Sequence, residues 1–159
     1  MIKITNIKSI VTWDTAQNKL IYIDNKSIFL KNKKIHKITS KNLSFDKEID
    51  AEDTIITPGF IDCHTHPVFS SNRAEEFNLR ISGMSYSEIA SKGGGINSSV
   101  SSLSKENEDS LFESCIARMD QFLFNGTTTL EAKSGYGLSL DNEIKSLNII
   151  KRINQNHIL

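Results

Sequence analysis

One stretch of the sequence, TPGFIDCHTHP at residues 57–67, constrains the fold and the chemistry more than any other. It contains a short apolar run followed by two histidines, His64 and His66, one residue apart. Side chains at positions i and i+2 of a β-strand point to the same side, so the two imidazoles are expected to converge. Pro67 has no N–H to donate to a sheet, so the strand is expected to stop there, with the histidines at its end.

Two imidazoles on one side of a strand end are able to share one metal ion when other elements complete the coordination shell. The alternative is that a lone His-x-His is accidental, or that it is a surface pair on an edge strand. Residues 54–63 are mostly apolar around the Pro58-Gly59 pair and show no polar alternation, which is typical of a strand covered on both faces. We therefore predict a metal site at His64 and His66.

Composition excludes several classes of partner. The 159 residues include 19 Lys+Arg and 19 Asp+Glu, so a net charge of zero gives no electrostatic case for nucleic acid or an acidic membrane surface. Two cysteines, Cys63 and Cys115, make no disulfide framework, and Cys63 is expected to be a buried structural thiol that points away from the histidines. No apolar run approaches the ~20 residues that span a bilayer, and residues 1–4 do not open a signal peptide. We expect a cytoplasmic protein.

Residues 1–53 are predicted to be rich in β-strand. The expected strands lie near residues 2–13, 20–23, 27–30 and 35–38, and the last two form a hairpin. Trp13 is expected to pack, whereas His36 is expected on an exposed, Lys-rich face of the sheet. Residues 40–50 are polar and are expected to form a connecting loop.

From about residue 54 the pattern changes to alternating strands and helices. After the histidine strand the sequence predicts a loop at 68–82, a short helix from Ser85, a helix over Ser104–Phe124, a strand at 127–132 and a helix from Leu140. Ser85 and Glu88 have the spacing of a capping box. This βαβα order indicates parallel strands joined by crossover helices.

The length limits how much of such a fold is present. A (β/α)8 barrel takes roughly 250 residues and builds its sites from the loops at the C-terminal ends of its strands. His64, His66 and Tyr136 all follow strands and are expected on that face. Two strand–helix units do not close a barrel, and a third strand is expected where the sequence stops. We therefore expect the front portion of a larger enzyme; the alternative is a small three-layer domain.

Four stretches resemble known proteins. PGFIDCHTH, residues 58–66, resembles the first barrel strand of the amidohydrolase superfamily. HPVFSSNRAEEF at 66–77, GGGINSSV at 93–100 and EAKSGYGL at 131–138 narrow the resemblance to the imidazolonepropionase family. The resemblance runs from about residue 54 to the end. It implies an α/β fold in which residues 54–159 form the first two β/α units of a truncated TIM barrel of amidohydrolase type. Residues 1–53 would form the N-terminal part of a small β-sandwich domain.

The resemblance also implies an activity, namely metal-dependent hydrolysis of 4-imidazolone-5-propanoate to N-formimidoyl-L-glutamate in histidine degradation. The family has one zinc (Zn²⁺) or iron (Fe³⁺) ion per subunit, and His64 and His66 match its first two ligands. Its third ligand, a histidine, its fourth, an aspartate, and its proton-transfer residues are expected beyond Leu159. The family suggests a homodimer acting on this small-molecule substrate. The fragment alone is expected to be inactive, and no catalytic residue is assigned within it.

Two further residues match substrate-binding positions of the family. Arg73 would bind the propanoate carboxylate, which suits the planar guanidinium; without the resemblance it reads as a surface arginine pairing with Glu75 or Glu76. Tyr136 lies between two glycines, and the alternative to a substrate contact is an ordinary packing aromatic. Near it, Lys133 and Glu131 are expected to form a local salt bridge, and neither is expected to have a catalytic role.

Other functions remain open from the residues. The chain also fits another amidohydrolase, such as a nucleobase deaminase or a dihydroorotase-like enzyme, although the Ser134–Gly137 loop and Arg73 count against this. A non-catalytic fragment or a binding module is the third reading. The Gly93–Gly95 run lacks the ending of a phosphate-binding P-loop and does not follow a strand, so a mobile loop near the substrate is the preferred interpretation.

Overall fold

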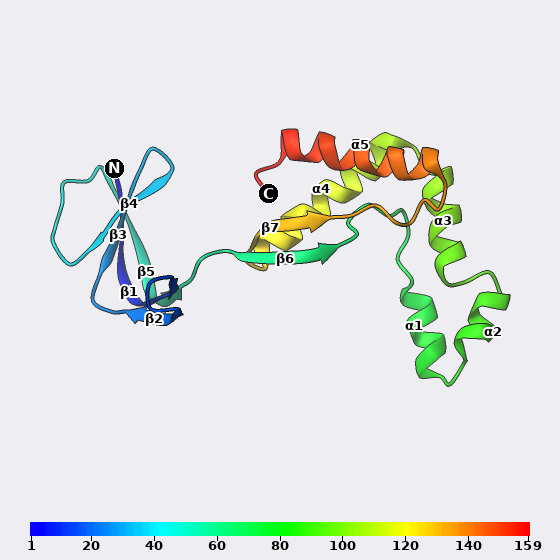
Figure 1. The fold of residues 1–159 in the computed structure, drawn as a ribbon, viewed down its shortest axis with the longest axis horizontal. Helices are drawn as coiled ribbons and strands as arrows, with labels where there is room; N and C mark the ends of the chain where they lie inside the picture. Colours follow the sequence, from blue (N-terminus) through cyan, green and yellow to red (C-terminus); the bar gives the residue numbers. More distant parts are fainter. The chain divides into compact units, whose positions relative to one another are not determined.

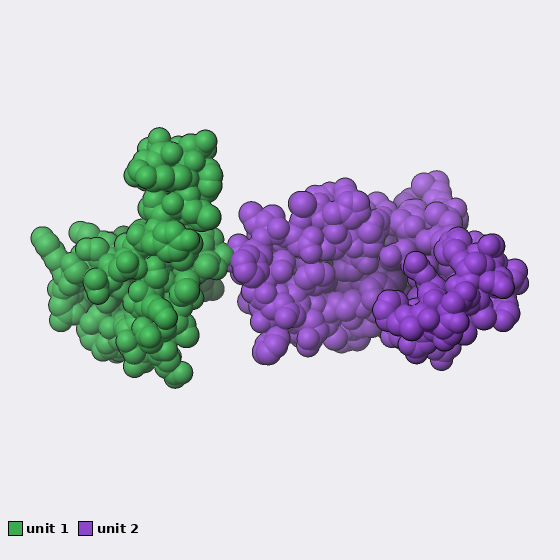
Figure 2. Space-filling view, turned by 90° about the horizontal axis from the view of Figure 1, so that it is seen from below, with its two compact units in different colours: residues 1–58 green, residues 59–159 purple.

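A computed structural model describes all 159 residues of the chain. The chain divides into two compact units, residues 1–58 and residues 59–159, which are coloured separately in Figure 2. The first unit contains only β-strands, whereas the second contains two strands and all of the helices (Figure 1). The two units are therefore described one at a time.

The first unit is one five-stranded sheet. Its strands are β1 (Ile2–Asp14), β2 (Lys19–Ile23), β3 (Ser27–Lys31), β4 (Lys34–Thr39) and β5 (Lys47–Ile56). Strand β1 pairs antiparallel with β2 and β3, and β3 pairs antiparallel with β4 across a tight turn. That turn has positive φ at both Asn32 and Lys33, which is the backbone of a two-residue hairpin turn. The predicted hairpin is confirmed, and the assignment of this unit to a β-sandwich stays a prediction.

Strand β5 differs from the prediction. It pairs in parallel with β1 along residues 47–56, where the sequence predicted first a loop and then the start of the histidine strand. Positive φ values at Asn6, Glu52 and Asp53 accompany shifts in the β1–β5 register. Because most β5 side chains are exposed, no hydrophobic alternation marks the strand, and only pairing with β1 defines it.

The core of the first unit is small. Ile7, Ile10 and Ile28 form its buried cluster, and Phe29 is fully buried. Trp13 was predicted to pack, but 53% of its surface is exposed, so that prediction is wrong. His36 is exposed on β4, as predicted.

The second unit has the predicted order of strand, helices, strand and helix. Its elements are β6 (Phe60–Thr65), α1 (Ala74–Ile81), α2 (Tyr86–Ser91), α3 (Ile96–Lys105), α4 (Glu108–Phe124), β7 (Thr127–Ala132) and α5 (Leu140–Asn156). Strands β6 and β7 are parallel neighbours, as expected for a crossover connection. In Figure 1, α4 and α5 lie alongside these strands, whereas α1 and α2 lie away from them.

Helices supply most of the core of this unit. The buried cluster consists of Val68, Leu103, Leu111, Phe112, Cys115, Met119, Ile149 and Ile153. Most of these residues come from α4 and α5, and the α4 members recur every three to four residues, so that they form one apolar stripe along the helix. Phe60 and Ile61 of β6 are exposed, the latter by 74%, so the prediction that this strand is covered on both faces is wrong for this chain.

Two helix boundaries also differ from the prediction. The helix expected over Ser104–Phe124 begins only at Glu108, because Asn107 caps α4 by accepting a hydrogen bond from the backbone N–H of Ser110 at 2.8 Å. Residues 96–105 form the separate helix α3, which the sequence did not predict. Helix α1 forms where a loop was predicted, and it has no buried residue whose spacing could have indicated it. The capping box of Ser85 and Glu88 is confirmed at the start of α2.

None of these helices combines the length and the apolar character needed to cross a membrane.

The two cysteines have contrasting environments, which gives a test of the fold. Cys63 was predicted to be buried, but its side chain is exposed, because no helix or strand covers it on β6. Cys115 is fully buried, and burial raises the pKa of its thiol to about 11 despite the nearby guanidinium of Arg118.

We expect one thiol of the native chain to react with a disulfide reagent at pH 8 and the second to react only in urea. Thiolate is the reacting form, and Cys115 is both protonated and covered at that pH. Counting thiols by absorbance with and without urea checks this. The Cys63→Ser variant should show none without urea, and a rapidly reacting thiol in that variant would contradict the packing of α4.

Candidate metal and substrate site

The two histidines converge at the end of β6. His64 Nε2 and His66 Nε2 are 3.3 Å apart, and the ring centroids are 5.3 Å apart. Between them, the buried side chain of Thr65 points the other way, and its hydroxyl donates to the backbone oxygen of Glu131 at 2.8 Å. The backbone oxygen of Thr65 accepts from Lys133 N at 2.9 Å. Anchoring of Thr65 to β7 therefore leaves both imidazoles on the opposite side of the strand.

The separation of the two nitrogens suits a shared metal ion. Two imidazole nitrogens about 2.0–2.1 Å from a tetrahedral zinc ion would lie about 3.3–3.4 Å apart. The same 3.3 Å also suits a direct hydrogen bond when only one of the two Nε2 atoms carries a proton. No cluster of three or more His, Cys, Asp or Glu side chains with the geometry of a metal site is present. The pair therefore supplies two ligands and no more.

Gly135 packs directly against His66. A Cβ atom at Gly135 would lie 2.9 Å from Cε1 and 3.0 Å from Nδ1 of the His66 ring, so no larger side chain fits without a shift. The φ of Gly135 is +147°, a value that side chains disfavour. His66 Nδ1 is buried and has no hydrogen-bond partner. The loop after β7 thus fixes one side of this imidazole.

Tyr136 follows in the same loop and lies against the histidine pair. Its ring centroid is 5.5 Å from that of His66 and 6.5 Å from that of Phe69, with the Phe69 contact edge to face. Tyr136 also packs against the buried cluster of the unit. The structure therefore places three of the four predicted site residues together: His64, His66 and Tyr136.

Arg73 lies outside this group. It occupies the position just before α1, and its ion pair is with Glu76, at 3.9 Å. The other Glu76 oxygen accepts from the backbone N–H of Gly95 at 2.9 Å. One amide of the Gly93–Gly95 run is therefore bound by a carboxylate of the chain, which agrees with the absence of P-loop features in this run.

Two side chains of α4 hold the segment that follows the histidines. Arg118 donates to the backbone oxygen of Pro67 at 2.9 Å, and its guanidinium lies 3.6 Å from the centre of the Phe69 ring. Cys115 Sγ donates to the same oxygen at 3.4 Å. This role of Arg118 was not predicted from the sequence. The one available signal was a charged residue beside the apolar stripe of α4.

The carboxylate of Glu131 and the ammonium of Lys133 form the predicted local salt bridge, at 2.9 Å. The hydrogen bond from Lys133 lowers the pKa of the Glu131 carboxyl. Both side chains are largely exposed, so this pair adds little stability.

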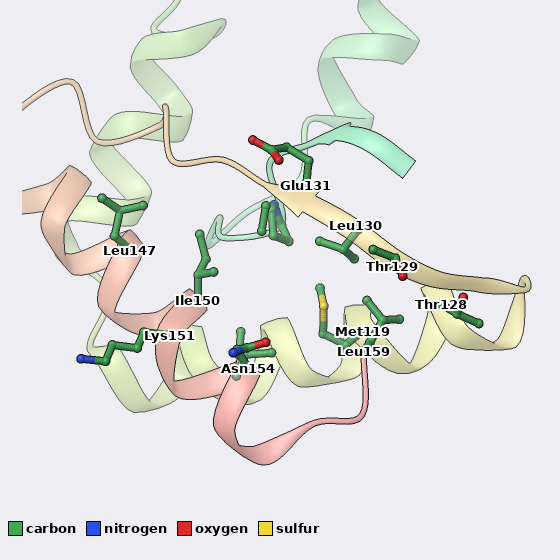
Figure 3. Close-up of a pocket in the computed structure, with 13 residues that line it drawn as sticks. Met119, Thr128, Thr129, Leu130, Glu131, Leu147, Ile150, Lys151, Asn154 and Leu159 are labelled. Atoms are coloured by element: carbon green, nitrogen blue, oxygen red, sulfur yellow. The ribbon is translucent and has the colours of Figure 1, made fainter. Parts of the chain in front are cut away.

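The pocket in Figure 3 is separate from the histidine pair. Its walls are β7 on one side and α5 on the other, with Met119 and Leu159 between them, as Figure 3 shows. None of His64, His66 or Tyr136 lines it. A second pocket, between β6 and α4, is bordered by His66, Phe69 and Arg118. The histidine pair therefore adjoins the second pocket and not the first.

We expect Gly135→Ala to displace the His66 ring and to lower the free energy of unfolding by about 1–3 kcal/mol, because the added methyl meets the imidazole in a strained backbone. Nuclear magnetic resonance of the histidine rings reports the displacement, and urea unfolding reports the stability. Gly83→Ala is the matched control, since Gly83 also has positive φ but has no atom within 4 Å of an added Cβ. Equal shifts of the His66 signals in both variants would count against the packing described here.

Comparison with known proteins identifies relatives by sequence, although no protein-family model matches the chain. The imidazolonepropionase of Brucella anthropi is 46% identical over 139 residues, which are 84% of this chain and 34% of that protein. The imidazolonepropionase of Psychromonas ingrahamii is 42% identical over 151 residues, 92% of this chain and 38% of that protein. The chain thus spans about a third of the length of the curated relatives it matches.

Solved structures add a likeness in fold. An atrazine chlorohydrolase mutant from Arthrobacter aurescens, complexed with zinc and atraton, has a TM-score of 0.58 at 20% identity over 98% of this chain and 33% of its own. A guanine deaminase from C. acetobutylicum with bound guanine has a TM-score of 0.52 at 18% identity, over 95% and 33%. At these identities the likeness shows a shared α/β fold, and nothing about the reaction. By its sequence identities of 42–53% to curated imidazolonepropionases, the chain matches a part of that enzyme.

Proposed function

We propose that this chain supplies part of the metal and substrate site of an imidazolonepropionase, which hydrolyses 4-imidazolone-5-propanoate to N-formimidoyl-L-glutamate in histidine degradation. The observation that carries the proposal is the His64–His66 pair, with its Nε2 atoms 3.3 Å apart and Tyr136 packed beside it. Relatives bearing the name imidazolonepropionase are 42–46% identical to this chain over 84–92% of its length.

The fold we propose is the opening part of a (β/α)8 barrel, over residues 54–159, after a β-sandwich segment at residues 1–53. Strands β6 and β7 are parallel and each pairs only with the other, so both outer edges of this small sheet lack a partner. Unpaired edges and the exposed side chains of Phe60 and Ile61 are what further barrel strands would cover.

His64 and His66 would hold a zinc or iron ion, one per subunit, through their Nε2 atoms. When bound, such an ion supplies a Lewis acid and lowers the pKa of a water to about 7. Imidazole nitrogens bind both metals well, and this chain's part is to present two of them on one side of β6. A third histidine and an aspartate, which the family resemblance implies, would come from residues beyond these 159.

The substrate would be held by Arg73 and Tyr136. A guanidinium pairs bidentately with a carboxylate, and the existing Arg73 pair with Glu76 is long and partly exposed, so it costs little to exchange it for the propanoate group. The Tyr136 phenol is able to donate to or accept from a polar group of the ring. Homodimer formation and a cytoplasmic location belong to the proposal as well.

We expect the chain to bind Zn²⁺ weakly, far short of the roughly 10–16 kcal/mol of structural zinc sites, because only two ligands are present. Isothermal titration with Zn²⁺ measures the affinity. His64→Ala and His66→Ala should each abolish this binding, and His36→Ala, which changes an exposed histidine of β4, should not. An unchanged isotherm in the His66→Ala variant would remove the metal assignment.

We also expect no hydrolysis of 4-imidazolone-5-propanoate by the purified chain supplied with Zn²⁺. Two ligands leave the ion poorly held, and the proton-transfer groups that the family resemblance implies lie outside these residues. Mass spectrometry for N-formimidoyl-L-glutamate is the measurement, with the full-length Brucella anthropi relative as the positive control. Turnover by this chain with one tightly bound ion would contradict the expectation.

A further inference from the structure

Glu143 is an acidic residue that neither the metal pair nor the substrate residues explain. It lies in the first turn of α5, where its side chain is half-buried. Its Oε1 atom accepts hydrogen bonds from the backbone N–H groups of Gly137 and Leu138, both at 2.8 Å. Its Oε2 atom is buried and has no hydrogen-bond partner. The Glu143 carboxylate therefore points toward the loop that precedes α5 and binds two successive amides there.

The two amides that Glu143 binds belong to residues that the loop holds in a strained and a tightly packed position. Leu138 has a positive φ of +49°, which costs a residue with a side chain about 1 kcal/mol or more, and its side chain is exposed. Gly137 is buried and lies so close to α5 that an added Cβ would meet the backbone of Asn142 and Glu143 at 2.7 Å. Its N–H therefore has no access to water and needs an acceptor inside the protein. Glu143 supplies that acceptor.

The electrostatics of Glu143 agree with this arrangement. Burial alone would raise the pKa of its carboxyl, but the Ser134 side chain and the backbone N–H groups of Leu138, Gly137 and Gly135 outweigh burial and lower the pKa. The charged form is thus favoured by the loop residues themselves. Every one of these donors lies in the segment between β7 and α5.

The same segment carries the two residues that contact His66. Gly135 packs on the His66 ring, and Tyr136 lies 5.5 Å from it, immediately before the two amides that Glu143 binds. We propose that Glu143 is a positioning residue, whose carboxylate holds the loop after β7 so that Gly135 and Tyr136 stay against His66. The relevance of this to substrate binding rests on the proposed function of Tyr136.

A role in the charge balance of α5 is the competing explanation, since acidic residues in a first helical turn are favoured by the helix dipole. Asp141 lies in the same turn but is exposed, and no hydrogen bond to the loop involves it. Asp141→Asn and Glu143→Ala each remove one negative charge from this turn, and only the second removes the acceptor of the loop amides. The two variants therefore separate the explanations.

The test uses the metal-free, full 159-residue chain and nuclear magnetic resonance. In Glu143→Ala we expect amide hydrogen exchange of Gly137 and Leu138 to rise about tenfold or more, and the cross-peaks between the Tyr136 and His66 rings to be lost. Asp141→Asn should change neither readout. Ile149→Val trims the buried cluster of α5 away from the loop, and it should raise exchange across the whole unit without selecting these amides.

The inference is overturned if Glu143→Ala keeps the Tyr136–His66 cross-peaks and raises amide exchange across the whole unit, as Ile149→Val does, without selecting Gly137 and Leu138. Should Glu143→Ala fail to fold, Glu143→Gln keeps one oxygen acceptor and should show a smaller, still selective, rise at the same two amides. Zinc titration keeps the two proposals distinct. If the unmodified chain binds no zinc but Glu143→Ala still selectively raises exchange at Gly137 and Leu138, only the proposed function is contradicted. If the unmodified chain binds zinc but Glu143→Ala has no selective effect on these amides, only the role of Glu143 is contradicted.

Discussion

The parallel pairing of β6 with β7 is the constraint on which the candidate site depends. Thr65 and Glu131 are 66 residues apart in sequence, and the hydrogen bond from Thr65 Oγ1 to the Glu131 backbone joins the ends of their two strands. This contact takes the side chain of Thr65 out of solvent and leaves His64 and His66 on the other side of β6. The loop after β7 then begins beside the histidines, which is why Gly135 and Tyr136 reach His66.

The two segments that leave this pair of strands are held in similar ways. After β6, Arg118 and Cys115 of α4 bind the backbone oxygen of Pro67; after β7, Glu143 of α5 binds the backbone amides of Gly137 and Leu138. In both cases side chains of a helix in the buried cluster satisfy backbone groups of the segment next to the site. Hydrogen bonds that involve a charged partner are worth about 1.5–3 kcal/mol, enough to favour one loop conformation strongly over others. The site is therefore positioned by α4 and α5, which form the buried cluster of the unit together with α3 and Val68.

This arrangement explains what the sequence could and could not predict. The histidine strand, the α4 stripe and the strand–helix order were predictable, because each leaves a periodic or paired signal in the chain. Strand β5 and helix α1 were not, since β5 is defined by pairing with a distant strand and α1 buries no side chain. The convergence of His64 and His66 follows from local geometry alone. Glu143 and Arg118 act on backbone groups that only the tertiary fold brings to them, and residue type does not reveal such a partner.

In the second unit the helices form a well-buried core, whereas the two-stranded sheet is largely exposed. Its buried cluster is built from α3, α4, α5 and Val68, so the helices bury one another whatever lies beside the outer edges of β6 and β7. The sheet has two strands and exposes Phe60 and Ile61, and the histidine pair has two nitrogens and no third ligand. The helices of the unit are thus closely packed, whereas β6 and β7 leave their outer edges unpaired. The order at the histidine pair therefore comes from the helices: Glu143 of α5 holds the loop that places Tyr136 against His66.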